Sequence, residues 1–311
     1  MLGNGSAGAG FNRTAVGIRG LTTVTPTTTN RSQKKKKTED GGRIDRVDRD
    51  DESNAMLMEF AEPEEDEKEE KLAAPAGHST SMVRFTDDAF RTDKAGRQIP
   101  PTFSDVDQGN LGDAWLLASC AAVAHAKPTA LLKRIRRNLN DSWTIKLGKD
   151  EYRVEPEFPN EGYADPMPNG QNDTLWVALV EKAFAQASAE SYANLECGNP
   201  ARALDLLTGR RARRQTITAT LPPELVFERL QEGRRASAPM VVRTHVARVG
   251  KPLTGDHYYA VLDAYEKDGV KHVRLYNPWG TKSNSRPLEE VMHDVTLDAL
   301  LNDCDALFIG G

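Results

Sequence analysis

The chain has 311 residues, a net charge of −5 and a pI near 5.8. This length fits one large or two medium domains, and no run of about 18 apolar residues is present that would span a membrane. The first residues lack a basic region followed by an apolar core, so we expect no secretory signal. The cysteines, Cys120, Cys197 and Cys304, are widely spaced. They indicate free thiols in a reducing compartment such as the cytoplasm, rather than a disulfide framework or a zinc site.

Residues 1–82 differ in composition from the rest of the chain. Gly, Ser and Thr dominate residues 1–33, a lysine run follows at 34–37, and an acidic block extends from Glu62 to Lys71. Such a segment buries too little apolar surface to offset its chain entropy, so we predict a long, mostly disordered, low-complexity tail. The acidic block cancels much of the field of the lysine run, so we expect no nucleic-acid partner.

From residue 83 onward the hydrophobic pattern is that of a globular protein. Helical segments are predicted at 112–126, 131–139, 175–188, 202–208, 224–231 and 297–302. Strands are predicted at 143–147, 152–158, 240–245, 257–264, 271–277 and 306–309. The pair Asp268-Gly269 predicts a hairpin between two of these strands. A helical half at 83–209 is therefore followed by a sheet-rich half at 210–311.

Residues 108–118 read Gln-Gly-Asn-Leu-Gly-Asp-Ala-Trp-Leu-Leu-Ala. A turn that contains glycine leads directly into an apolar helix. Cysteine proteases present their nucleophile in this way, because the positive end of a helix favours a thiolate. Position 114 holds alanine, which cannot attack a substrate. The sequence therefore predicts an active-site frame without its reacting atom.

The other groups that a thiol protease requires occur at suitable spacings. His257 follows Ala114 by 143 residues, and Asn277 follows His257 by 20. A histidine base, an orienting asparagine and a side-chain donor for the oxyanion are the expected partners of the thiol. Gln108 lies six residues before position 114 and is the candidate donor.

Taken together, these blocks resemble the protease core of the calpain family. Gln108 to Ala118 match that family's nucleophile motif except at Ala114, and Asn277 to Gly280 (Asn-Pro-Trp-Gly) match in full. His257-Tyr-Tyr-Ala-Val, residues 175–185 and residues 207–209 resemble three further blocks. The resemblance spans residues 85–311. It implies a papain-like α+β fold, with a helical half that carries position 114 and an antiparallel, barrel-like sheet half.

The resemblance also implies roles for individual residues. His257 would be the base, Asn277 would orient it, and Gln108 would complete the oxyanion hole. Trp279 would shield the bond between His257 and Asn277, and Gly198 would line the groove for the substrate backbone.

The chain departs from the family pattern in two ways. Asp256 stands where family members often have glycine, so we expect it to crowd or recharge the substrate groove. Animal calpains bind two calcium ions in the core, and Asp105 and Asp173 lie near one expected site. The acidic ligands expected after Asn-Pro-Trp-Gly are missing, because residues 281–283 read Thr-Lys-Ser. We therefore expect no required cofactor and no full pair of calcium sites.

Alanine at position 114 has two interpretations, an engineered substitution or a natural pseudoprotease. The retention of Gln108, His257, Asn277 and Trp279 favours substitution, since drift after loss of activity would erode several of them. With cysteine at 114 the chain is predicted to be an endopeptidase acting on protein or peptide substrates. Its own tail is a candidate substrate, and a targeting role for the tail stays open. The rivals are a non-enzymatic peptide- or partner-binding module and a transglutaminase-like acyl transferase, and the motifs disfavour the latter.

Overall fold

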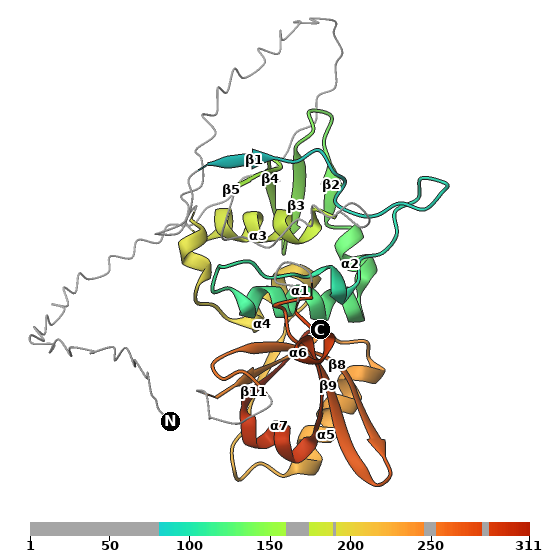
Figure 1. Ribbon diagram of the computed structural model, residues 1–311, viewed down its shortest axis with the longest axis vertical. Coiled ribbons are helices and arrows are strands. Elements are labelled where there is room, and N and C mark those ends of the chain that lie inside the picture. The colour runs from blue at the N-terminus through green and yellow to red at the C-terminus, as the bar shows by residue number, and fades with distance from the viewer. Residues whose placement is uncertain (1–80, 160–173, 189–190, 246–252, 282–285) are drawn as a thin grey trace, which may run out of the picture. The chain divides into compact units, whose positions relative to one another are not determined.

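The computed structural model describes residues 81–159, 174–188, 191–245, 253–281 and 286–311 (Figure 1). All of them belong to one unit, Asp66–Gly311. Nearly all of the predicted tail, residues 1–82, lies outside the described residues, and so does Asp173. The domain boundaries at 82 and 209 stay predictions.

The described strands form three antiparallel sheets. The first pairs β1 (Met82–Arg84) with β5 (Glu157–Pro159), and the second has the order β2 (Ile135–Arg137), β3 (Trp143–Leu147), β4 (Asp150–Val154). The third has six strands in the order β10 (Met292–Thr296), β9 (Val270–Tyr276), β8 (Tyr258–Lys267), β7 (Met240–Thr244), β11 (Cys304–Ile309), β6 (Arg213–Thr216). Helices accompany these sheets, so the predicted mixture of helix and antiparallel sheet is confirmed.

The α-helices are α1 (Ala114–Ala126), α2 (Pro128–Leu132), α3 (Trp176–Ala187), α4 (Pro200–Thr208), α5 (Pro223–Arg235), α6 (Leu288–Val291) and α7 (Leu297–Asp303). Two short 3₁₀ turns are η1 (Phe103–Asp105) and η2 (Tyr192–Leu195). Helix α1 is buried all round from Ala114 to Ala124, as its uniformly small and apolar sequence predicts. No described helix is long and apolar enough to cross a bilayer.

The helix predicted at 131–139 is wrong. Helix α2 ends at Leu132, and residues 135–137 form strand β2, which pairs with β3 and buries Ile135 against Ile145. Pairing with a neighbouring strand thus outweighs the helical preference of a short arginine-rich segment. Strands β6 and β10 were not predicted, because their sequences, Arg-Arg-Gln-Thr and Met-His-Asp-Val-Thr, are mostly polar.

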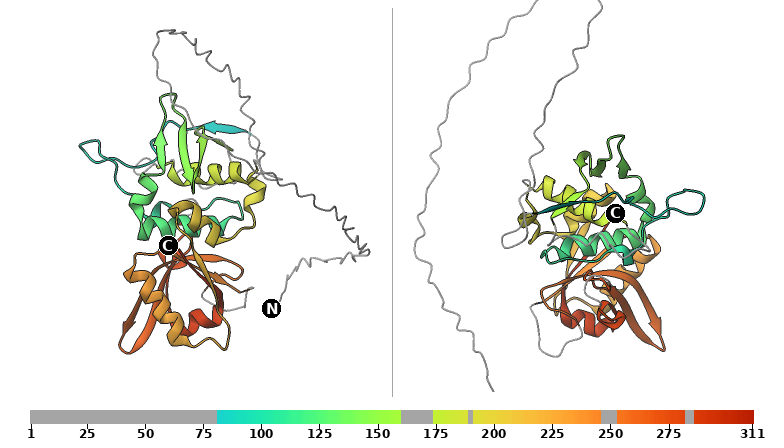
Figure 2. Two further views of the ribbon diagram at one scale, coloured as in Figure 1. Left: turned by 180° about the vertical axis from the view of Figure 1, so that it is seen from behind. Right: turned by 45° about the horizontal axis from the view of Figure 1, so that its top comes forward.

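The six-stranded sheet has an apolar layer on each face. Side chains alternate across a strand, so Val241 joins the core around α1 while Val242 joins a second core with α5 and α7. Phe308 and Leu307 divide between the two cores in the same way. Figures 1 and 2 show α1 on one side of this sheet and α5 and α7 on the other.

Hydrogen bonds join the segment before α1, and α1 itself, to the six-stranded sheet. The Tyr276 hydroxyl donates to the Val106 carbonyl at 2.7 Å, and the Gln108 N–H donates to the Pro278 carbonyl at 2.9 Å. His125 Nε2, near the end of α1, lies 2.7 Å from the Leu262 carbonyl. These contacts fix the approach to α1 against the ends of β8 and β9, where the predicted site residues lie.

Candidate active site

Ala114 is the first residue of α1 and follows the turn that begins at Gln108. The Asp113 carbonyl accepts the Leu116 N–H at 2.8 Å and starts the helix. The N–H groups of a first helical turn have no partner within the helix, and the helix dipole makes this end positive. Ala114 as a whole residue is 8% exposed. The methyl group therefore sits where a thiolate would be stabilised.

His257 and Asn277 flank a hairpin. His257 directly precedes β8 and Asn277 directly follows β9, which is antiparallel to β8. The connecting residues Asp268 and Gly269 have φ angles of 52° and 76°, as a two-residue hairpin turn requires. The predicted hairpin is thus confirmed, and it brings both residues to the same end of the sheet.

The two side chains are hydrogen-bonded. His257 Nε2 lies 2.8 Å from Asn277 Oδ1. The same oxygen accepts the Trp279 N–H at 3.1 Å, which identifies it as the amide oxygen. Nε2 must then carry the proton, and a neutral ring leaves Nδ1 as an acceptor. Such an imidazole can take a proton from a nearby thiol.

A turn from Asn277 to Gly280 places the Trp279 indole against this pair. Its ring centre is 4.8 Å from that of His257, and the Arg286 guanidinium lies 4.5 Å from the indole centre. Gly280 has φ of 67°, and a Cβ there would lie 2.6 Å from the Asp107 carboxyl carbon. Only glycine fits this close approach, which explains the last residue of Asn-Pro-Trp-Gly.

Burial determines the charge of the imidazole. His257 is 6% exposed, and burial lowers its pKa to about 4, with partial compensation from the bond to Asn277. The ring is therefore neutral at pH 7 in this chain.

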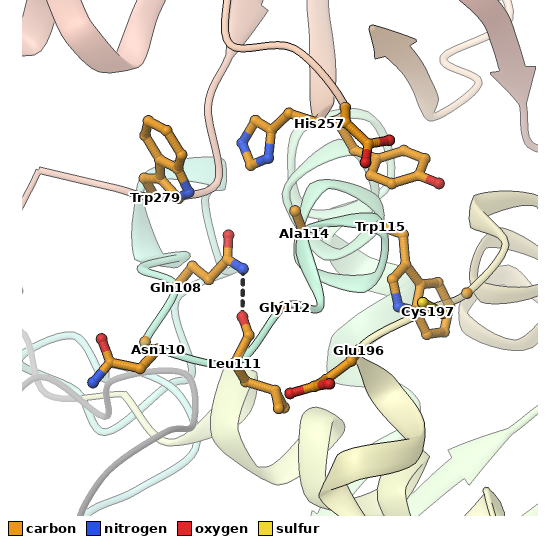
Figure 3. Close-up of a pocket in the computed structure, with 14 residues that line it drawn as sticks. Gln108, Asn110, Leu111, Gly112, Ala114, Trp115, Glu196, Cys197, His257 and Trp279 are labelled. Carbon is orange, nitrogen blue, oxygen red and sulfur yellow. Dashed lines mark hydrogen bonds between the residues drawn. The ribbon is translucent and has the colours of Figure 1, made fainter. Parts of the chain in front are cut away.

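Gln108 lies in the same pocket and is 5% exposed. Its Nε2 donates to the Leu111 carbonyl at 2.7 Å (Figure 3). The same Nε2 donates to Asp113 Oδ1 at 3.4 Å. Asp113 is completely buried, as is Glu181 of α3, and burial raises the pKa of Asp113. The buried carboxyl group of Asp113 therefore contacts the side-chain amide of Gln108. The sequence did not predict this contact.

The pocket has a volume of about 450 Å³. The pocket is lined by Gln108, Ala114, His257, Trp279, Gly198 and Asp256, among others. Figure 3 shows Ala114 at the start of α1, with Gln108, His257 and Trp279 around it. Asn277 is 1% exposed and lies behind His257. The structure thus brings together every described residue of the predicted catalytic and substrate-binding set.

Gly198 and Asp256 each have a local reason for their position. A Cβ on Gly198 would lie 2.0 Å from the Trp115 ring, so the backbone passes directly over the indole. Asp256 is exposed and has φ of 49°, in the left-handed region that glycine tolerates best and aspartate tolerates better than most residues. Sequence analysis missed Glu196, which also lines the pocket; its place two residues before Gly198 was the available signal.

Asp105 makes several contacts within the protein. Its carboxylate accepts the Thr102 N–H at 2.8 Å and the Trp176 indole N–H at 3.2 Å, and it pairs with Arg91 at 3.3 Å. These contacts anchor η1 and α3. Asp173, the other calcium candidate, lies outside the described residues, so the expectation of no full pair of calcium sites stays a prediction.

Comparison with known proteins identifies a protease family. Residues 157–288, which include His257 and Asn277, match the calpain family cysteine proteases. The chain is 29% identical over 198 residues to the calpain-type cysteine protease ADL1 of Oryza sativa subsp. japonica, covering 58% of this chain and 9% of that protein. It is 29% identical over 197 residues to the calpain-type cysteine protease DEK1 of Arabidopsis thaliana, with the same coverages.

A third relative is calpain-10 of Rattus norvegicus, which is 25% identical over 241 residues, or 66% of this chain and 36% of that protein. The chain thus spans from about a tenth to about a third of the length of these relatives. The chain belongs to the calpain family of cysteine proteases.

Proposed function

We propose that this chain is a calpain-like cysteine endopeptidase core with a papain-like two-subdomain arrangement, inactive because position 114 is alanine. A cysteine thiolate at 114 would attack the substrate carbonyl, and His257 would protonate the leaving amine. The Gln108 amide and the N–H of residue 114 would hold the oxyanion. Water would then hydrolyse the acyl-enzyme, with His257 acting as base.

One observation carries this proposal. The hydrogen-bonded pair of His257 and Asn277 lines or backs the pocket into which the first residue of α1 projects. A histidine with a purely structural role would not need an asparagine partner and the first residue of a helix at the same pocket. The side-chain amide of Gln108 is the third component, a donor for the oxyanion. It comes from the segment before α1, whose backbone is joined to Pro278 by the Gln108 N–H.

The direct test is Ala114→Cys, treated with a thiol-reactive peptide inhibitor and measured by intact mass. Cys197 is an exposed free thiol in the same pocket, so the test is performed in a Cys197→Ser background. We expect one stoichiometric adduct at position 114 and cleavage of a peptide substrate. Adding His257→Ala should lower kcat/KM by about 1000-fold. A correctly folded Ala114→Cys variant that neither reacts nor cleaves would refute the proposal.

We further propose that the active form removes its own N-terminal tail. The Ala114→Cys chain should shorten with time, and mixing it with the Ala114 chain distinguishes cleavage within one molecule from cleavage between molecules. Repeating the assay with calcium or with a chelator tests the expectation that calcium is not required. If the Ala114→Cys chain stays intact but still cleaves other peptides, self-processing is refuted and the proposed endopeptidase activity is not.

The charge of the pocket suggests a substrate preference. Glu196 and Asp256 line it, and none of the lining residues in the described part of the chain is a lysine or an arginine. We propose a preference for peptides with a basic residue near the scissile bond, since a carboxylate there gains a charge-assisted bond. In the active form, Glu196→Gln with Asp256→Asn should reduce the advantage of lysine over glutamine in matched peptides.

The alternative is a peptide-binding module without catalysis. The intact pocket beside Ala114 favours retention of peptide affinity in the chain as it stands. Binding by the Ala114 chain, with no turnover by the Ala114→Cys form, would support this alternative.

A further inference from the structure

A second pocket lies at the edge of the six-stranded sheet. It has a volume of about 470 Å³ and shares no lining residue with the pocket around Ala114. Arg211, Arg213 and Arg214 come from the segment that forms β6, and Arg229 comes from α5. Glu232 is the single acidic side chain among the described residues that line it, and the terminal residue Gly311 lines it as well. Four positive charges therefore gather at one place on a chain whose net charge is −5.

These four guanidinium groups make no ion pair with another described residue, whereas other exposed arginines do. Arg136 pairs with Glu151 at 2.9 Å, and Arg137 pairs with Asp88 at 3.0 Å. The contrast is informative because β2, which carries Arg136 and Arg137, is also an edge strand. Asp305, which pairs with Arg243, attracts Arg214 only from a longer distance. Like charges that cluster without close ion pairs repel one another, and an anionic ligand would relieve that repulsion.

The backbone of β6 also offers binding groups. β6 is the last strand of the described sheet and pairs with β11 on one side only. Alternate residues of an antiparallel edge strand direct their N–H and C=O groups away from the sheet. An extended peptide can satisfy those groups by adding a strand.

The side chains of β6 favour an extended ligand over a compact anion. Arg214 lies opposite Phe308, with its guanidinium 6.0 Å from that ring, whereas Arg213 lies opposite Ile309. Phe308 belongs to the core around α1 and Ile309 packs against the core with α5. Arg213 and Arg214 therefore leave β6 toward opposite faces of the sheet and line the pocket from two sides, an arrangement that suits an extended ligand better than one small anion. They can flank a strand whose own side chains alternate in the same way.

We propose that the outer edge of β6 and the arginine pocket form a docking site for an extended acidic peptide. Strand pairing supplies the backbone contacts, and Arg211, Arg213, Arg214 and Arg229 bind carboxylates of the peptide. The site is separate from the pocket around Ala114, so binding does not require hydrolysis or the function proposed above.

The test measures fluorescence anisotropy of a labelled peptide with the sequence of residues 62–71, Glu-Pro-Glu-Glu-Asp-Glu-Lys-Glu-Glu-Lys. The full Ala114 chain is used, with its own acids at 62–70 replaced by amides so that they cannot compete. A control peptide carries Gln and Asn in place of the acids. We expect saturable binding of the acidic peptide that weakens as salt rises, because added ions screen the charges.

Two matched double variants locate the site. Arg213→Gln with Arg214→Gln should weaken binding about tenfold or more. Arg136→Gln with Arg137→Gln removes the same charge from the other edge strand and should leave binding unchanged. Arg229→Glu, on α5, provides a third variant that does not alter β6, and it should also weaken binding. Circular dichroism verifies folding of each variant.

Equal affinity in both double variants, or in the Arg229→Glu chain and its parent, would overturn the proposal. So would binding of inorganic polyphosphate without binding of the peptide. A peptide with methyl groups on alternate backbone nitrogens should bind more weakly than its parent, and unchanged affinity would refute the strand-pairing component.

Discussion

The contact between Gly198 and Trp115 gives a quantitative test of the packing in the wall of the pocket around Ala114. In Gly198→Ala, the added Cβ would lie 2.0, 2.3 and 2.4 Å from three carbons of the indole. Ordinary contact begins at 3.4 Å, so one side must move by about 1.4 Å. The indole has little freedom to move. It is 5% exposed, its N–H donates to the Leu195 carbonyl at 2.7 Å, and its ring packs edge-on against Phe184.

The cost follows from this overlap. Inserting one carbon into a well-packed site typically costs about 1–3 kcal/mol, and a rigid aromatic neighbour places Gly198→Ala near the upper end. Loss of the Trp115 hydrogen bond would add about 1 kcal/mol. We therefore expect the free energy of unfolding to fall by about 4 kcal/mol. With a urea slope of about 2 kcal/mol/M, the unfolding midpoint shifts by about 2 M.

Gly112→Ala is the matched control. Gly112 lines the same pocket, but its added Cβ would have no neighbour closer than 3.7 Å, and its φ is not left-handed. We expect its midpoint to change by less than about 0.5 M. Both variants are compared with the parent by urea denaturation followed by tryptophan fluorescence and circular dichroism. Equal midpoints for Gly198→Ala and Gly112→Ala would refute the packing argument.

Three further predictions concern the titrating and orienting groups. The folded-state pKa of His257, about 4, lies below the unfolded value near 6.5, so the unfolded chain binds more protons between these limits. The contribution of the neutral His257 to the free energy of unfolding is complete above pH 6.5 and is lost as the pH falls toward 4. His257→Gln should reduce the change in the free energy of unfolding across this pH range by about 3 kcal/mol, measured by urea unfolding at several pH values. Burial raises the pKa of Asp113, so stability should fall as pH rises above the unfolded aspartate value, and Asp113→Asn should flatten this trend in the same assay. In the Ala114→Cys enzyme, Asn277→Ala should lower kcat/KM at least tenfold in peptide hydrolysis, because the imidazole loses its orientation.

Much of the frame around the site could be predicted from the sequence. Asp268-Gly269 identified the hairpin, and with it the meeting of His257 and Asn277. The small and apolar residues of 112–126 predicted a buried helix, which the structure shows to begin at Ala114, and strand β3 was predicted with its observed bounds. These features depend on local turn chemistry and hydrophobic periodicity, which short windows of sequence contain.

Other features depend on partners far away in the chain. β2 forms because β3 is beside it, although Ile135–Arg137 alone has no strand alternation. The carboxyl group of Asp113 is buried near Glu181 because α3 packs near α1, and no spacing rule connects positions 113 and 181. Likewise the arginines of β6 could be seen in the sequence, but only the folded structure shows that they form no ion pair with another described residue.

The groups that hold the pocket in shape do not include the side chain at position 114. Gln108 is held by Pro278 and Leu111, and His257 is held by Asn277. Alanine differs from cysteine by one sulfur atom, so neither set of bonds should change when cysteine is introduced. The change at 114 should therefore separate hydrolysis from peptide binding: Ala114→Cys should alter turnover by orders of magnitude but substrate affinity by less than about tenfold, as measured by the dissociation constant of a non-cleavable peptide.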